Sequence, residues 1–176
     1  MDAQKIELKS PLTTDAGPLF TLIDQDRTNL AHWLPWAATT LTIADERIFL
    51  RYCQGRIADK QLWLSVIWVA GQPAGMIDLH EFKDHHADVG YWLGREFRGQ
   101  GIMSRSLALT EQVGFEQLDL VKISLLAALK NDASRQVAVR NHYHQDGILR
   151  QHIPALNGYT DAVVYSKLKS EYQKNV

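Results

Sequence analysis

Along the chain, apolar positions recur either every second residue, which is the period of a strand, or every three to four residues, which is the period of a helix. Apolar alternation and short apolar runs predict strands at 6–9, 62–69, 74–80, 87–93, 122–129, 147–155 and 160–168. Apolar positions three or four apart predict helices after 13–15, over 42–58, from 102 to about 118 and from 131 to about 144.

The elements follow one another as β-α-α-β-β-β-α-β-α-β-β, and this order predicts an α/β domain with a mixed sheet. The helix after strand 87–93 has the length of a normal crossover, so we expect strand 122–129 to run parallel to it. Turns at Gly71-Gln72-Pro73 and Asn157-Gly158 predict antiparallel hairpins. Residues 1–176 are expected to form a single domain.

The stretch from Val89 to Ser104 leads from an apolar strand through a turn with two glycines, Gly99 and Gly101, into a helix. The first amides of a helix have no partner inside it, and glycine lets the backbone approach a bound group closely. The stretch therefore predicts a phosphate or pyrophosphate site, with an ordinary tight turn as the alternative. The absence of Gly-x-x-x-x-Gly-Lys-Ser/Thr leaves a nucleotide P-loop unsupported, and the third glycine of a dinucleotide fingerprint is missing.

Three motifs carry a resemblance to a known family. Arg98-x-x-Gly101-x-Met103, preceded by Gly90-Tyr91-Trp92-Leu93 and followed by Asn131-x-x-Ser134, resembles the acetyl-CoA motif of the GNAT N-acetyltransferases. With Arg140-Asn141-His142-Tyr143, the pattern is similar to the Rim-type branch (RimJ and RimL), which acetylates the N-termini of ribosomal proteins. The resemblance covers nearly the whole chain. It implies a mixed, mostly antiparallel twisted sheet of about seven strands, with flanking helices and a parallel β-α-β cofactor site.

The resemblance also implies acetyl-CoA as the co-substrate. The amides of 98–103 would receive its pyrophosphate, and main-chain groups of Trp92 and Leu93 would pair with the pantetheine arm like an added strand. The implied binding residues are Trp92, Leu93, Arg98, Gly99, Gln100, Gly101, Ile102, Met103, Ser104 and Asn131. Arg98 either adds charge there or faces water.

Amine attack on a thioester needs no covalent enzyme intermediate. In many GNAT members a tyrosine seven residues after the helix-capping Asn protonates the leaving sulfur, but here that position is Ala138. Ser134 lies one turn earlier on the same face, and the Rim-type resemblance implies reliance on a serine there. We expect Ser134 to hydrogen-bond or protonate the thiolate; its alternative role is a second capping hydroxyl beside Asn131.

The general base is less well defined. The Rim-type pattern has an acidic residue near the last hairpin, where this chain reads His152-Ile153-Pro154-Ala155. We favour Asp88 as the base and keep His80 and Glu81 as candidates, each with an ordinary surface role as its alternative. An α-amine with a pKa near roughly 7.7–8.0 is partly neutral at cell pH, whereas a lysine near about 10.4 is not. A poorly defined base therefore favours an N-terminal α-amine as the acceptor.

Trp33 and Trp36 flank Pro35, which ends a helix and predicts an irregular corner. Packing at the edge of the core is one interpretation of this pair. The resemblance implies instead that the region borders the acceptor, so that both rings and His80 would contact the substrate. The acceptor would be a protein N-terminus, or else a small amine such as an antibiotic, polyamine or aminoacyl conjugate. A non-catalytic acyl-CoA-binding module is a further alternative.

Composition narrows the class of protein. The net charge is −1 and no basic cluster carries aromatic residues, so we expect neither nucleic acid nor membrane as a partner. Cys53 is the only cysteine, which excludes an internal disulfide and fits a reducing compartment. Residues 1–5 lack the profile of a secretory signal, and no apolar run approaches membrane-spanning length. We expect a cytoplasmic protein without a metal site, and the sequence is compatible with a homodimer.

Overall fold

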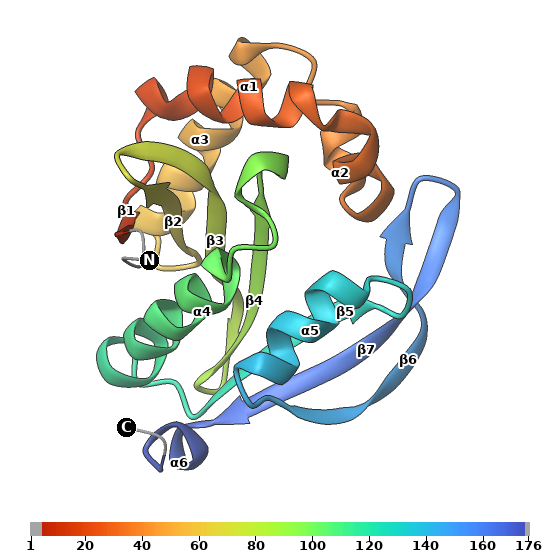
Figure 1. Cartoon of the computed structure of the whole chain (residues 1–176). Helices are drawn as coiled ribbons and strands as arrows, with labels where there is room; N and C mark the ends of the chain where they lie inside the picture. The colour runs from red at the N-terminus through yellow and green to blue at the C-terminus, as the bar shows by residue number, and fades with distance from the viewer. Residues whose placement is uncertain (1–4, 175–176) are drawn as a thin grey trace.

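The computed structural model describes residues 5–174 as one sheet of seven strands with helices on both faces (Figure 1). The strands are β1 (Ile6–Lys9), β2 (Trp63–Val69), β3 (Gln72–Lys83), β4 (His86–Leu93), β5 (Lys122–Ala128), β6 (His144–Ala155) and β7 (Gly158–Leu168). The α-helices are α1 (Ala16–Gln25), α2 (Arg27–Trp33), α3 (Ile43–Ala58), α4 (Ile102–Gln112), α5 (Asp132–Arg140) and α6 (Lys169–Tyr172). Single 3-10 turns are η1 (Thr13–Asp15), η2 (Pro35–Ala38) and η3 (Arg95–Phe97), and a π-helical turn, η4 (Val113–Gln117), continues α4.

The strands lie in the order β1-β2-β3-β4-β5-β7-β6, and only the contact between β4 and β5 is parallel. This arrangement confirms the predicted mixed sheet, with α4 as the crossover between the two parallel strands. Their pairing covers only 86–89 of β4 and 122–125 of β5. Beyond Val89 and Leu125 the two strands diverge, so the last residues of β4 have a strand neighbour on one side only, β3.

Two apolar cores cover the two faces of the sheet. One lies under α4 and α5 and includes Val89 and Leu93 of β4; the other lies under α1, α2 and α3 and includes Trp92. Successive residues of a strand point to opposite faces, and this alternation explains why neighbours on β4 enter different cores. The nearly continuous apolar runs of the central strands therefore match a sheet that is covered on both sides.

Several element boundaries differ from the prediction. Helix α5 ends at Arg140 and not near 144, because His142 adopts a left-handed φ of +59° that a helix cannot continue. Strand β3 extends to Lys83, since Asp84 and His85, with φ of +51° and +59°, turn the chain directly into β4. Helices α2 and α6 are not predicted, because seven and four residues are too short to show a helical period.

The predicted domain of 1–176 includes residues 1–4 and 175–176, which lie outside the described residues. Four of the five N-terminal residues that lack the profile of a secretory signal, 1–4, therefore also lie outside the described residues. Between residues 5 and 174, no helix is long and apolar enough to cross a lipid bilayer.

Glu46 of α3 gives the protein a specific dependence of stability on pH. Its side chain is enclosed, with 2% exposed, and burial raises its pKa from 4.5 to about 7. The folded state therefore holds a proton that the unfolded state releases, so stability is lost as the pH rises from about 4.5 through 7. We expect the free energy of unfolding to fall by roughly 2–3 kcal/mol across this window relative to a Glu46→Gln variant. Urea denaturation of both proteins at pH 5 and pH 8 measures the difference, and parallel behaviour would contradict it.

Candidate active site

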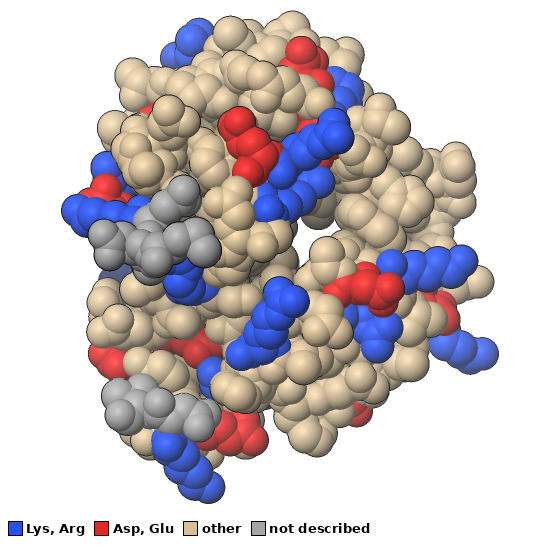
Figure 2. Space-filling view, in the orientation of Figure 1, with Lys and Arg blue, Asp and Glu red and all other residues tan. Residues whose placement is uncertain are grey.

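A cavity of about 680 Å³ occupies the place where β4 and β5 diverge. Its walls come from the ends of both strands, from the first turns of α4 and α5, and from α2. Figure 2 shows the molecule open at this place, between the part that carries α1 to α3 and the part that carries α5 and β5 to β7. The cavity therefore has walls from both faces of the sheet.

The first turn of α4 forms one wall. Gly99 and Gly101 have left-handed φ values of +75° and +70°, as the glycine turn predicts, and Gly101 is the N-cap of the helix. The first hydrogen bond of the helix joins Arg105 N to Gly101 O at 3.1 Å, so the amides of 102–104 have no partner within it. These amides and the positive end of the helix dipole suit a bound phosphate group.

Arg98 does not face water as a free charge. Its guanidinium donates two hydrogen bonds, of 3.0 and 2.8 Å, to the carbonyl of Leu93. It also lies 2.6 Å from Oδ2 of Asp26, a buried carboxylate between α1 and α2. Arg98 therefore ties the end of β4 to these helices. The Leu93 carbonyl, which we expected to meet the pantetheine arm, already accepts hydrogen bonds from this side chain.

Ser134 lies in the first turn of α5, against the cavity. The side chain of Asn131 caps this helix and accepts a hydrogen bond of 3.1 Å from Ser134 N. The Ser134 hydroxyl lies 2.9 Å from the hydroxyl of Tyr91 on β4, so it is paired across the cavity wall and does not act as a second cap. Burial raises the pKa of Tyr91 to about 12. Tyr91 therefore stays protonated near neutral pH and can donate to Ser134.

A group of titratable residues lies on the other face of the sheet. The His80 imidazole places Nδ1 2.6 Å from Oδ1 of Asp78, and this hydrogen bond is the main cause of a raised His80 pKa. Asp88 is the cross-strand partner of His80, and burial raises the pKa of its carboxyl group. His80 and Asp88 line the cavity. The sequence predicts a site role for both of them but not for Asp78.

The chain turns a corner between α2 and η2, and the two tryptophans of this corner have different surroundings. Trp33 lines the cavity, whereas Trp36 lies outside it and packs against Trp92, with ring centroids 6.0 Å apart and planes at 62°. Trp36 therefore supports the wall from behind. This matches the core-edge interpretation for one ring of the pair.

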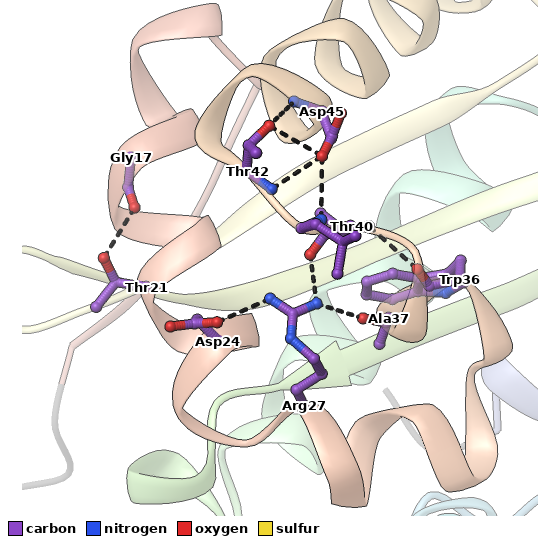
Figure 3. A network of polar contacts seen from close by, with 10 residues as sticks. Gly17, Thr21, Asp24, Arg27, Trp36, Ala37, Thr40, Thr42 and Asp45 are labelled. Carbon is purple, nitrogen blue, oxygen red and sulfur yellow. Dashed lines mark hydrogen bonds and ion pairs between the residues drawn. The ribbon is translucent and has the colours of Figure 1, made fainter.

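Arg27 holds this corner together, as Figure 3 shows. Its guanidinium donates to the carbonyl oxygens of Ala37, at 2.6 Å, and Thr40, and forms an ion pair of 2.9 Å with Asp24. The chain that follows Thr40 is fixed by the capping box of α3, in which Asp45 N donates to Thr42 Oγ1 at 3.2 Å. Trp33 thus projects from a braced segment.

Comparison with known proteins identifies the family. Residues 5–144 match the model of the acetyltransferase (GNAT) domain. The chain belongs to the GNAT family. It is therefore an acyltransferase of the N-acetyltransferase type, and its seven-stranded sheet is the GNAT fold, as the motifs predicted.

Named relatives confirm the resemblance to the Rim-type branch. The chain is 30% identical over 162 residues to “Putative ribosomal N-acetyltransferase YdaF” of Bacillus subtilis, a match covering 90% of this chain and 88% of that protein. It is 25% identical over 171 residues to the ribosomal-protein-serine acetyltransferase of Escherichia coli, covering 94% of each. Among solved structures, the microcin C7 self-immunity acetyltransferase MccE, in complex with acetyl-CoA and AMP, shares the fold. Its TM-score is 0.89 at 23% identity, over 93% of this chain and 92% of that one.

In this GNAT chain every residue proposed for the site lines the cavity except Trp36, Gln100 and Glu81. The Gln100 side chain turns back and donates to the carbonyl of Glu96 at 2.7 Å. Ala138, at the position of the tyrosine in many family members, is fully buried in the core under α5. Within residues 5–174, no three His, Cys, Asp or Glu side chains gather as metal ligands would.

Proposed function

We propose that this enzyme transfers an acetyl group from acetyl-CoA to the free α-amine of a protein, and that the acceptor is a ribosomal protein. The observation that carries the proposal is the cavity between β4 and β5, which has a wall suited to a phosphate group on one face of the sheet and titratable groups on the other.

The donor side supports acetyl-CoA. The unpaired amides at the start of α4 suit its pyrophosphate, and Gly99 and Gly101 leave open space there, since a Cβ on either would contact nothing within 4 Å. Beyond Val89, β4 has one edge without a strand neighbour, and an extended pantetheine arm could add to it. When bound, acetyl-CoA would supply the activated acyl carbon.

The residues around the gap between β4 and β5 support acetyl transfer. Ser134 would donate a hydrogen bond to the departing thiolate. Tyr91, by donating its own hydroxyl hydrogen to Ser134 Oγ at 2.9 Å, would leave the serine hydrogen free for that role. Asp88 would add negative charge that holds the acceptor ammonium beside the reacting carbon.

Two observations support a protein N-terminus as the acceptor. The B. subtilis and E. coli relatives carry names that refer to ribosomal acetylation. We call the face of the sheet that carries Asp78, His80 and Asp88 the acceptor face. Its groups could help to deprotonate an α-ammonium with a pKa near roughly 7.7–8.0, but they offer little for a lysine with a pKa near about 10.4.

A panel of acceptors tests the proposal. It contains a lysine-free peptide that begins with a free serine, the same peptide with a blocked α-amine and one lysine, and a polyamine. We expect mass spectrometry to detect acetyl transfer from acetyl-CoA to the first peptide at least tenfold faster than to the others. Preference for the polyamine would overturn the protein acceptor, and preference for lysine would overturn the α-amine.

A further inference from the structure

Asp78 and His80 form a short side-chain hydrogen bond on the acceptor face. Both residues lie on β3, two positions apart, so they point to the same side of the sheet. The hydrogen bond of 2.6 Å uses Nδ1 of the imidazole. His80 Nε2 has no hydrogen-bond partner among residues 5–174, and His80 lines the cavity.

The backbone of β4 leaves room above this pair. Gly90 is the cross-strand partner of Asp78. A Cβ at Gly90 would lie 3.0 Å from Oδ2 and 3.2 Å from Oδ1 of Asp78, and 3.3 Å from Cε1 of His80. Glycine at this position therefore lets the pair lie directly against β4, at the edge of the gap where the acyl group would be transferred.

We propose that Asp78 and His80 form a catalytic dyad in which His80 Nε2 removes a proton from the acceptor ammonium and Asp78 orients the imidazole. This inference deepens the proposed function and rests on it, since it assigns the base for the same transfer. It also defines the acceptor as an amine that arrives protonated. His80 then replaces Asp88 as our candidate for the base, and Asp88 keeps the role of holding the charge.

Two protons leave the acceptor nitrogen during the transfer. The ammonium gives one proton to His80 Nε2, and the freed electron pair of the nitrogen attacks the thioester carbonyl carbon, so that a C–N bond forms. The C–S bond breaks and its electron pair stays on sulfur, where Ser134 stabilises the thiolate. The nitrogen loses its second proton to make the amide, the thiolate gains one to become a thiol, and the proton on His80 leaves to water.

Charged neighbours from several elements set the proton affinity of His80. On its own strand these are Asp78 and Glu81, and from β4 Asp88 faces it; all three favour the imidazolium, whereas burial opposes it. Lys122 of β5 and His152 of β6 act on Asp88, and the Cys53 thiol of α3 lies near Asp78. The net effect is a raised pKa, so part of His80 is protonated near neutral pH. Activity should therefore rise with pH through the titration of His80.

Activity measured against pH tests the dyad in the whole chain of 176 residues. We expect His80→Gln to lower kcat about 100-fold near pH 7 with unchanged affinity for acetyl-CoA. The loss should shrink above roughly pH 9, where the amine is already neutral without help. Asp78→Asn should move the acidic limb of the kcat profile to lower pH, because removing the carboxylate lowers the pKa of His80. A loss that stays constant with pH would show a structural role and overturn the proposal.

The chain offers a matched control. His144 of β6 also pairs through Nδ1 with an aspartate two positions along, Asp146 Oδ1 at 2.9 Å, but it is 73% exposed and lies outside the cavity. His144→Gln should leave kcat and its pH profile unchanged. If His144→Gln lowered kcat as His80→Gln does, the effect could not be assigned to the dyad and the proposal would be overturned.

A second readout separates failure of the dyad from failure of the proposed acceptor. The pH profiles use whichever amine of the acceptor panel the wild-type enzyme acetylates, so rejection of the peptide overturns the acceptor and leaves the dyad testable. Independently, NMR titration of the His80 imidazole should give a pKa above the ordinary value of about 6.5, and a lower one in Asp78→Asn. An unchanged value in that variant would overturn the dyad whatever the substrate.

Discussion

Replacing Ser134 with alanine is expected to lower kcat about 100- to 1000-fold while affinity for acetyl-CoA stays nearly the same. A positioned donor that stabilises developing negative charge typically contributes this much to turnover. The serine meets the leaving sulfur only as charge develops, so the ground-state complex should hardly change. Its hydroxyl is available for this because Tyr91 and not the helix backbone is its partner, at 2.9 Å.

Single-turnover kinetics and calorimetry with acetyl-CoA separate the two quantities. Tyr91→Phe removes the partner but keeps the serine, and should cause a smaller loss in kcat. Ser170→Ala, an exposed serine on α6, is the matched control and should have no effect. Unchanged turnover in Ser134→Ala would remove this residue from the mechanism.

Replacing Lys167 with methionine is expected to lower the free energy of unfolding by about 3–5 kcal/mol. Lys167 of β7 lies 2.7 Å from Oε2 of Glu111 on α4 and donates to the carbonyl of Asn141 at 2.9 Å. Both charged side chains are almost fully enclosed, with 6% and 3% exposed. Without the lysine, Glu111 would be a buried carboxylate without a cation, and burial already raises its pKa.

Denaturation in urea measures this loss. Adding Glu111→Gln to Lys167→Met removes the unpaired charge and should restore part of the stability. The exposed pair of Lys169 and Asp119, also 2.7 Å apart, is the control, and Lys169→Met should change stability little. Equal effects of the two lysine substitutions would show that the enclosure of Lys167 does not matter.

Much of the fold could be predicted because its central strands and long helices have a clear period. The glycine turn at Gly99 and Gly101 was predicted together with its backbone conformation, since few other residues adopt a left-handed φ at low cost. Short elements such as α2 and the early end of α5 were missed, because one or two turns show no period and the backbone of His142 depends on its tertiary surroundings.

The cavity could be predicted only in part. Motif spacing identified most of its lining, but the direction of individual side chains depends on contacts far along the chain. Arg98 turns towards Asp26, a residue 72 positions earlier that no local pattern connects to it. Tyr91 and Asp78 were missed for a related reason. Each acts through a partner side chain: Tyr91 meets Ser134, 43 positions along the chain on α5, and the hydrogen bond between Asp78 and His80 on the same strand depends on side-chain orientation, which periodicity does not give.

The divergence of β4 and β5 has a consequence for the order of events in turnover. Because the walls that suit donor and acceptor belong to opposite faces of the sheet, neither molecule has to leave before the other enters. We therefore expect both to bind at the same time and the acetyl group to pass directly between them without residing on the protein. Initial-rate kinetics should then be sequential, with the product amide departing on its own side of the sheet and the thiol on the other.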